Sequence, residues 1–546
     1  MNNSGIFSSI AHWFSQNILS LGKEMRLSYL PPLMVYMAYG ISGLSAIVGT
    51  FFVKDYLGLS AEFLAALGFW AVIPWSLKIP VGHLVDLMWR YKGWLVLLGA
   101  SLIAASLLIM AGLLTDRAAM LTVMSAESWY VWSVLLAPIG YVIQDVVADG
   151  MTVDAVPQYD EQGEAIPEKK LKLMHITMQT LGRVAIIGGS LLVALVNLYV
   201  FRDVGDLSEL EKVTAYGDIY RMALIIPFVS VLGVGLAALF QHRETKQLLA
   251  NGMTKKDVYA LRTDSVEGTQ PNWWILGGSF IFVAFTISMG LSDYQYSQEV
   301  IFLGSFSIIS FLIYKLTLEL SQEARATLVG TAIIIFVYRA MPSAGPGMSW
   351  WMIDNLKFDQ QFFSLLSLIG SALTLTGMFI FRRFMAGHSQ AYIIGMLTIV
   401  TTFLALPFLG MFYGLHEWTA ALTGGVVDAR FIALVDTAVE SPLGQIAMIP
   451  MLAWIANSAP KHLKATFFAV MASFTNLALS ASQLGTKYLN QMYTVTREVK
   501  DPVSGAVQTA ANYSDLGTLM MFSIGLGLVL PFVAIFIVRV SRLKWA

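Results

Sequence analysis

The chain of 546 residues contains no cysteine and has few charged residues. Without cysteine it can form neither a disulfide bond nor a thiolate metal site. Only 13% of its residues are charged, against roughly 25% in soluble domains, and 56% are hydrophobic. The net charge of −1 gives no reason to expect nucleic acid as a partner. These shortages, with a mean hydropathy of +0.66, indicate a protein that lies mostly in the lipid bilayer.

Apolar stretches long enough to cross a bilayer recur along the whole chain. Because backbone polar groups must be satisfied within hydrocarbon, each stretch is expected to be a helix. The predicted spans are 31–53, 61–87, 94–114, 129–156, 173–200, 219–241, 273–291, 299–317, 327–352, 361–381, 391–413, 430–457, 464–488 and 517–540. The pattern predicts an all-α membrane protein with about fourteen transmembrane helices.

The spans divide the chain into five expected parts. These are a cytoplasmic amphipathic segment (1–30), an N-terminal six-helix bundle (31–241), a cytoplasmic loop (242–271), two extra transmembrane helices (272–326) and a C-terminal six-helix bundle (327–546). If the N-terminus is cytoplasmic, Lys and Arg are about twice as frequent in the inner segments as in the outer ones. We therefore expect a multi-pass protein of a bacterial inner membrane with both termini in the cytoplasm.

An internal repeat indicates that the two bundles are homologous. Residues 51–67 align without gaps on residues 350–366, so that Asp55 falls on Asp354 and Phe63 on Phe362. Two six-helix halves of this kind are the plan of the major facilitator transporters. The segment GHLVDLMWRYK (82–92) fits the same plan, and its Asp86 and Arg90 are expected to be gating residues between the second and third helices.

Three basic residues remain inside the spans, namely Lys78, Arg183 and Arg339. They lie roughly 13–18 Å from the inner ends of their helices, near the middle of the bilayer. Asp145 shares this depth and Asp149 lies one turn away. An ionisable group at that depth normally faces a partner or an aqueous path. The excess of positive charge favours an anionic solute, bound by the three basic residues.

The two carboxylates allow two interpretations. Asp145 is expected to meet Arg183, because helices 4 and 5 are neighbours in sequence and each carries polar residues four apart. This pair can be a purely structural ion pair, or Asp145 and Asp149 can take part in proton coupling. Lys78 and Arg339 are expected to have no carboxylate at their level.

Further candidates complete the expected pathway. In RAMPSAGPGMSWW (339–351), Pro342 and Pro346 should break the seventh helix and form a gate. Asp154 is expected to gate the inner mouth, and Trp350 and Trp351 to belong to an interfacial aromatic belt. The remaining residues expected to line the substrate path are Tyr36, Tyr39 and Asn476.

Several of these segments together resemble the folate–biopterin transporter family of the major facilitator superfamily. The resemblance is carried by FFVKDYLGLS (51–60), Lys78-Ile-Pro-Val-Gly82, Asp145-x-x-x-Asp149, Pro342-Ser-Ala and ATFFAVMASFTN (465–476). QDVVADGMTVDAVP and LGRVAIIGGSLL are also similar to muropeptide permeases, which remain the rival family.

The expected function is secondary active transport by alternating access. The solute would be an anionic, amphipathic molecule such as a folate or pterin, and a symporter driven by H⁺ is the expected mechanism. No convergent nucleophile or metal cluster is found, so neither an enzyme nor a cofactor is expected, and the protein should be a monomer in the bilayer. The alternatives are a muropeptide or other small-solute permease, or a receptor or scaffold that does not transport.

Overall fold

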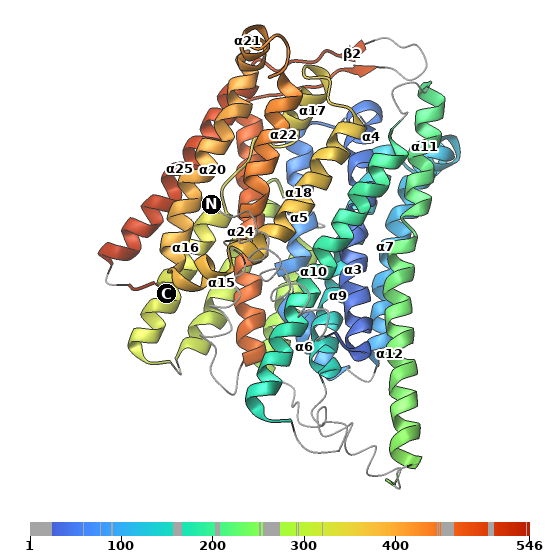
Figure 1. Cartoon of the computed structure of the whole chain (residues 1–546), viewed down its shortest axis with the longest axis vertical. Coiled ribbons are helices and arrows are strands. Elements are labelled where there is room, and N and C mark those ends of the chain that lie inside the picture. Colours follow the sequence, from blue (N-terminus) through green and yellow to red (C-terminus); the bar gives the residue numbers. More distant parts are fainter. Residues whose placement is uncertain are drawn as a thin grey trace, which may run out of the picture.

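The computed structural model describes most of the chain. The described residues are 25–57, 59–76, 78–88, 91–156, 166–202, 208–250, 253–254, 273–290, 292, 294–318, 320–444, 446, 448, 464–500, 507–541 and 543–545. The predicted segment 1–30 lies mostly outside this set, and so does most of the predicted loop 242–271. Within the described chain, long helices run roughly along the longest axis of the molecule (Figure 1).

The first part of the chain forms the helices of spans 1 to 6. They are η2 (Leu27–Tyr29), α3 (Leu30–Ile41), η3 (Ser42–Ser45), α4 (Ala46–Tyr56), α5 (Ala61–Ser76), α6 (Lys78–Leu87), α7 (Lys92–Thr115), α8 (Arg117–Val123), α9 (Ala126–Ala155), α10 (Glu168–Val200), α11 (Glu209–Met222) and α12 (Ile225–Ala250). Two helices follow, α14 (Trp273–Gly290) and α15 (Ser297–Thr317). They coincide with the two predicted extra spans.

The last part forms the helices of the remaining six spans. They are α16 (Gln322–Arg339), α17 (Pro346–Asp354), α18 (Gln360–Ile380), α19 (Arg382–Gly387), α20 (Gln390–Phe412), α21 (Leu415–Leu422), α22 (Ala429–Glu440), η6 (Ser441–Leu443), α24 (Lys464–Met492) and α25 (Leu516–Val540). A two-stranded antiparallel sheet, β1 (Val499–Lys500) and β2 (Val507–Thr509), lies between α24 and α25. Helices α16, α18, α20 and α22 each begin after a Ser or Asp whose side chain accepts a hydrogen bond from the first turn.

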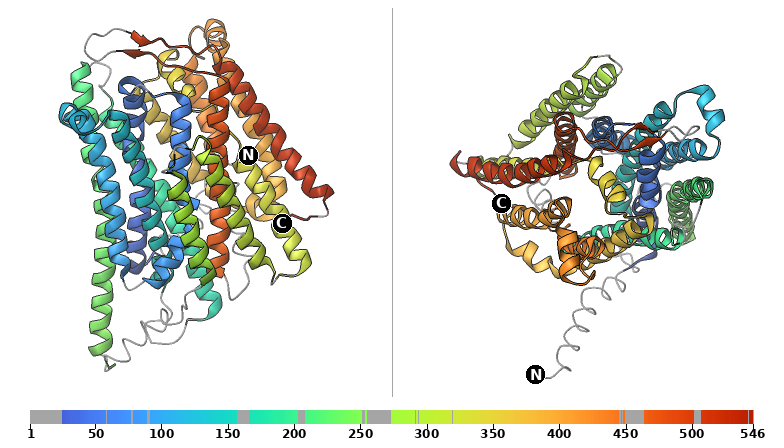
Figure 2. Two further views of the ribbon diagram at one scale, coloured as in Figure 1. Left: turned by 180° about the vertical axis from the view of Figure 1, so that it is seen from behind. Right: turned by 90° about the horizontal axis from the view of Figure 1, so that it is seen from above.

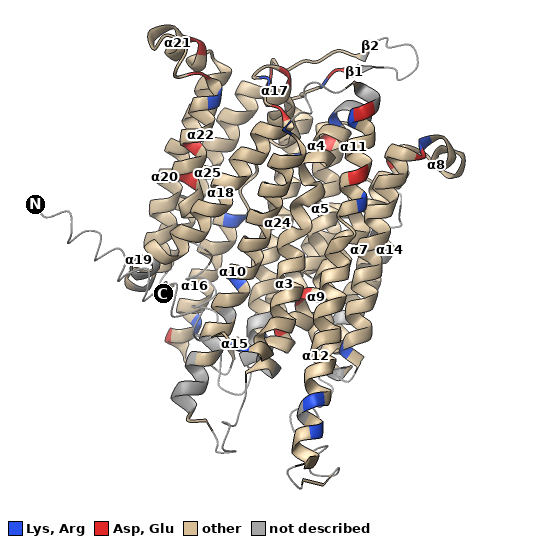
Figure 3. Ribbon diagram, turned by 45° about the vertical axis from the view of Figure 1, so that its right-hand side comes forward, with Lys and Arg blue, Asp and Glu red and all other residues tan. Residues whose placement is uncertain are grey.

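The predicted all-α membrane fold is confirmed. Nine helical segments among the described residues are long and apolar enough to cross a membrane. Four of the other five predicted spans are broken into two helices or include residues outside the described set, and the fifth, 464–488, lies within the single long helix α24. Figure 2 shows the helices from above, gathered around a common centre. Figure 3 shows that most charged residues lie toward the two ends of the helices, as the low charge content of the spans requires.

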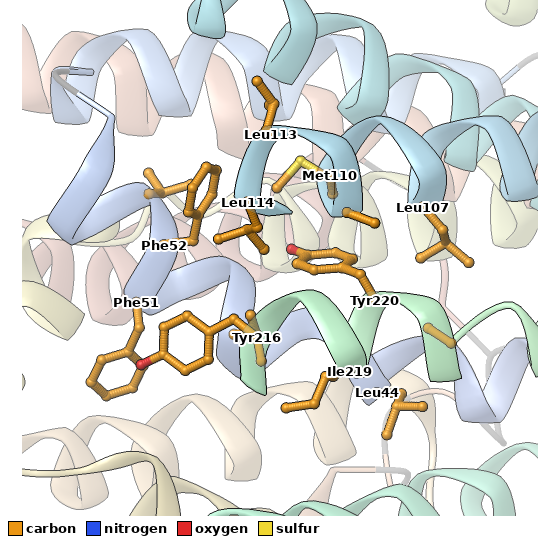
Figure 4. Close-up of a cluster of buried hydrophobic side chains, with 14 of the residues drawn as sticks. Leu44, Phe51, Phe52, Leu107, Met110, Leu113, Leu114, Tyr216, Ile219 and Tyr220 are labelled. Atoms are coloured by element: carbon orange, nitrogen blue, oxygen red, sulfur yellow. The ribbon is translucent and has the colours of Figure 1, made fainter. Parts of the chain in front are cut away.

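The largest hydrophobic cluster fixes the helices of spans 1, 3 and 6 against one another. Phe52 of α4, Leu113 of α7 and Tyr216 of α11 are almost completely buried there. Figure 4 shows the aromatic rings of this cluster beside the aliphatic side chains of α7. The cluster lies toward the end of the molecule that carries β1 and β2 (Figure 1), which we call the β1–β2 end.

Helices α3 and α10 cross at very short range. A Cβ atom placed on Gly40 would lie 2.1 Å from the carbonyl oxygen of Ile186, and one on Gly189 would lie 2.9 Å from Gly40. Close backbone contact through small residues is a common way to associate helices in a membrane. This contact draws α10 toward α3, and α10 also packs along α18.

The segments of the internal repeat meet in space. Helix α4 and helix α17 both lie at the β1–β2 end (Figure 1), and Lys54 Nζ of the first segment is 2.5 Å from Asp354 Oδ1 of the second. The expectation that Trp350 and Trp351 form an exposed aromatic belt is wrong. Their exposed fractions are 2% and 4%, because α17 is covered by the chain around β1 and by neighbouring helices.

Candidate transport site

Lys78 is the centre of a charged cluster in the first half of the chain. It is the first residue of α6, and its Nζ atom lies 2.6 Å from Asp145 Oδ2 and 2.7 Å from Asp149 Oδ2 on α9. The Tyr36 hydroxyl on α3 donates a hydrogen bond of 2.6 Å to Asp149 Oδ1. The Asp145 side chain is 14% exposed and that of Asp149 is 41% exposed. Asp149 is therefore the more accessible carboxylate of the cluster.

The predicted ion pair between Asp145 and Arg183 is wrong, and so is the expectation that Lys78 has no carboxylate at its level. Helix α10 packs along α3 and α18 and only slightly against α9. Neighbouring helices in sequence are thus not neighbours in space here. Helix α6 lies against α9 instead, so both aspartates of α9 reach Lys78.

Arg183 and Arg339 are the two central basic residues that form no ion pair in the described chain, although Arg183 lies within electrostatic range of Asp145. Arg183 is on α10 and Arg339 is the last residue of α16, so they come from opposite halves of the chain. Within the described residues neither forms an ion pair, and the buried Nε atom of Arg339 has no hydrogen-bond partner. The two guanidinium groups are close enough to repel each other electrostatically. An anion placed between them would relieve that repulsion.

Tyr39 and Asn476, two of the three predicted lining residues, both contact Trp75 near the end of α5. The Tyr39 ring makes edge-on contacts with the rings of Trp75 and Tyr141, with centroids 5.5 and 5.6 Å apart. Asn476 Nδ2 of α24 donates a hydrogen bond of 3.3 Å to the carbonyl oxygen of Trp75, next to the end of α5. The amide of Asn476 therefore joins the two halves of the chain.

The seventh predicted span is broken as its prolines predict. Helix α16 ends at Arg339 and α17 begins at Pro346, with Gly345 between them at a φ of 76°, which favours glycine. Side chains of α24 and α25 satisfy the freed backbone groups. The hydrogen bonds are Ser482 Oγ to Met341 O, Ser523 Oγ to Pro342 O, Asn490 Nδ2 to Ala344 O, and Ser343 N to Thr486 Oγ1.

The structure describes the remaining predicted gating residues only in part. Arg90 lies outside the described residues, as do the side chains of Asp86 and Asp154, whose backbones belong to α6 and α9. Both of these backbones lie near the ends of their helices.

Sequence reasoning missed two carboxylates of the second half. Asp436 and Glu440 are one turn apart on α22, and Asp436 is 6% exposed. Glu440, Arg339 and Thr401 line a cavity of about 260 Å³ between α16, α20 and α22. Two acidic residues one turn apart inside the predicted span 430–457 were the available signal in the sequence.

A group of polar contacts ties the two halves at the β1–β2 end. Besides the Lys54–Asp354 ion pair, Arg497 of the second half donates hydrogen bonds to the carbonyl oxygens of Lys54 and Leu59 in the first half, and Tyr513 of the second half donates one that holds Asp354 in place. Arg497 is only 3% exposed and its guanidinium lies 5.0 Å from the centre of the Trp350 ring. We call Lys54, Asp354, Arg497 and Tyr513 the cross-half tie.

The hairpin of α14 and α15 covers the contact between the halves. Gln298 of α15 donates a hydrogen bond of 3.0 Å to the carbonyl oxygen of Ala66 on α5. Glu299 accepts hydrogen bonds from Lys487 (3.0 Å) and Tyr488 (2.6 Å) on α24. Helix α15 therefore contacts both halves, where α5 and α24 pack together.

Comparison with known proteins agrees with this arrangement. Residues 315–543 match the model of the BT1 family. A folate-biopterin transporter of Synechocystis sp. is 23% identical over 479 residues, covering 87% of this chain and 76% of that protein. A POT family transporter solved in complex with 5-aminolevulinic acid has the same fold, with a TM-score of 0.57, 12% identity and coverage of 94% and 96%. The nucleoside transporter NupG gives a TM-score of 0.52 at 10% identity, covering 94% of this chain and 99% of its own.

The fold and these matches define a multi-pass membrane transporter with the major facilitator architecture. Within that class, residues 315–543 match the BT1 family and most of the chain is similar to a folate-biopterin transporter, which supports the resemblance to the folate–biopterin transporters.

Proposed function

We propose that the protein is a secondary active transporter that moves an anionic, folate- or pterin-like solute by alternating access, and not an enzyme. The observation that carries this proposal is the pair Arg183 and Arg339. Each half of the chain supplies one cation without a carboxylate partner in the described structure, and the two lie within electrostatic range. An anion bound by both would hold the halves together, which couples occupancy of the site to their relative motion. The relative named as a folate-biopterin transporter supports the choice of solute.

The cluster of Lys78, Asp145, Asp149 and Tyr36 is the proposed site of proton coupling. Asp149 is the more exposed carboxylate and shares Lys78 with Asp145, so a proton can reach it from water. Protonation would leave Lys78 with one carboxylate and release the Tyr36 hydroxyl from a charged acceptor. This change alters the contacts between α3, α6 and α9, next to the arginine site.

We also propose how the protein is oriented in the membrane and which residues open and close its two ends. We place both termini in the cytoplasm of a bacterial cell, so the β1–β2 end faces outward and the cross-half tie closes it. The break at Pro342 and Pro346 would let α17 move separately from α16, while Asp86, Arg90 and Asp154 would act at the inner mouth. Tyr36, Tyr39 and Asn476 would line the path, and the protein would work as a monomer.

Uptake into proteoliposomes tests this proposal. The purified protein should accumulate labelled folate when the pH gradient is directed inward, and collapse of the gradient by a protonophore should abolish accumulation. Asp149→Asn should exchange folate between the two sides but fail to accumulate it. Absence of folate-dependent flux in either direction would remove the proposed solute, and gradient-driven accumulation by Asp149→Asn would remove the proposed coupling site.

A further inference from the structure

The cavity between α16, α20 and α22 contains opposite charges in an apolar setting. Arg339 and Glu440 contribute the charged groups, while Ile335, Ile394 and Leu443 contribute apolar walls. Glu440 is an exposed residue, and in the part of the chain that is described it forms no hydrogen bond or ion pair. One turn earlier on α22, the buried Oδ1 atom of Asp436 also has no hydrogen-bond partner there.

Two charged groups of opposite sign that do not pair with each other are available to a ligand. The carboxylate of Glu440 can accept two parallel hydrogen bonds, as it would from a guanidinium group. A 2-amino-4-oxopyrimidine edge, as in a pterin ring, presents two adjacent N–H donors in the same parallel arrangement. Arg339, which lines the same cavity, can bind a carboxylate of the same solute.

The size of the cavity sets how much of the solute it can hold. Pockets that enclose a whole drug-sized ligand usually measure roughly 300–1,000 Å³. At about 260 Å³ this cavity is suited to one flat ring system, and its aliphatic lining residues offer apolar contacts to such a ring. The rest of the solute would extend toward Arg183.

Resting on the proposed function, we infer that Glu440 forms the subsite for the donor edge of an aminopyrimidinone ring, while Arg339 and Arg183 bind the anionic part of the same solute. The two subsites therefore discriminate between the two halves of a folate-like molecule. Loss of one subsite should weaken only the fragment that it binds.

Competition with two fragments of folate tests this division. Purified protein is loaded with labelled folate, and displacement is measured with biopterin, which has the ring but no carboxylate, and with p-aminobenzoylglutamate, which has the carboxylates but no pterin. Glu440→Gln should weaken competition by biopterin about tenfold or more, because a carboxylate that accepts two hydrogen bonds is lost. Competition by p-aminobenzoylglutamate should change less than about twofold. Arg339→Gln should show the opposite selectivity.

The controls separate the subsite from folding and from the proposed function. Glu417→Gln, at an exposed carboxylate of α21, should leave both fragments unaffected. Glu440→Asp keeps the charge and withdraws it by one methylene, so it should again weaken biopterin selectively. If both variants of Glu440 affect the two fragments equally, or not at all, the subsite is wrong. If the wild-type protein binds neither folate nor the fragments, the proposed solute itself is wrong.

Discussion

At the residue scale, the charged side chains predicted to lie near the middle of the bilayer form two groups. Lys78 with Asp145 and Asp149 carries a net charge of −1, whereas Arg183 and Arg339 carry +2 without a carboxylate partner in the described chain. The depth of these residues can be predicted from sequence, because it depends only on helical rise and span length. Their partners cannot, because pairing depends on which helices touch. The net charge of Lys78, Arg183, Arg339, Asp145 and Asp149 together is positive whether Asp145 pairs with Arg183, as predicted, or with Lys78, as observed.

Removal of both carboxylates around Lys78 should be costly. Asp145→Asn with Asp149→Asn leaves a largely buried ammonium group unpaired, which is expected to destabilise the fold by about 3–5 kcal/mol. Each single variant keeps one partner and should lose less than half of that. Thermal unfolding of the purified protein in detergent measures the difference.

The matched control is Asp218→Asn, which removes an exposed ion pair with Arg221. Exposed pairs contribute about 0–1 kcal/mol, so its unfolding temperature should hardly change. A double variant as stable as this control would contradict the burial of an unpaired Lys78.

At the scale of elements, breaks and crossings set which side chains can meet. The break between α16 and α17 is predictable, since Pro342, Gly345 and Pro346 are visible in the sequence. The hydrogen bonds that satisfy it are not, because Ser482, Asn490 and Ser523 lie far along the chain. The crossing of α3 and α10 likewise depends on contacts between distant glycines.

A methyl group at that crossing should separate the two helices. Gly40→Ala places a Cβ atom 2.1 Å from the carbonyl oxygen of Ile186, too close for any real contact, so the backbones must move apart. We expect a loss of stability of at least about 2 kcal/mol, measured by thermal unfolding. Gly188→Ala on α10 is the control, because its Cβ atom meets nothing within 4 Å, and it should be neutral or slightly stabilising. Equal effects of the two changes would contradict the close crossing.

At the scale of the whole molecule, the two halves pack directly through α5 with α24 and α10 with α18, and they are joined further by polar contacts at the β1–β2 end and by the hairpin of α14 and α15. The 6 + 2 + 6 order of spans and the internal repeat predict two halves and two added helices. They do not predict that Asp354 of one repeat binds Lys54 of the other, or that α15 contacts both halves. These contacts join residues from 188 to 300 positions apart in the chain, so local sequence patterns cannot predict them.

The absence of cysteine makes the closure of the β1–β2 end measurable. A single cysteine introduced at Thr401, in the cavity wall, should react slowly with a membrane-impermeant maleimide added from the β1–β2 side. Lys54→Ala removes the ion pair with Asp354, so it should increase that rate several-fold. Arg430→Gln disrupts an exposed ion pair with Asp359 within the second half and should leave the rate unchanged. A rate unaffected by Lys54→Ala would mean that the cross-half tie does not close this end.

The central claim is that Arg183 and Arg339, one from each half, bind the same anion. Equilibrium binding of labelled folate to the purified wild-type protein and to Arg183→Gln, Arg339→Gln and the double variant tests it most directly, with Arg430→Gln as a control for surface charge. Each single variant should bind folate about tenfold or more weakly than the wild type. The fold-loss of affinity in the double variant should be smaller than the product of the two single fold-losses, because both arginines act on one group. Unchanged affinity in either single variant, or a loss equal to that product, would contradict a shared anion site.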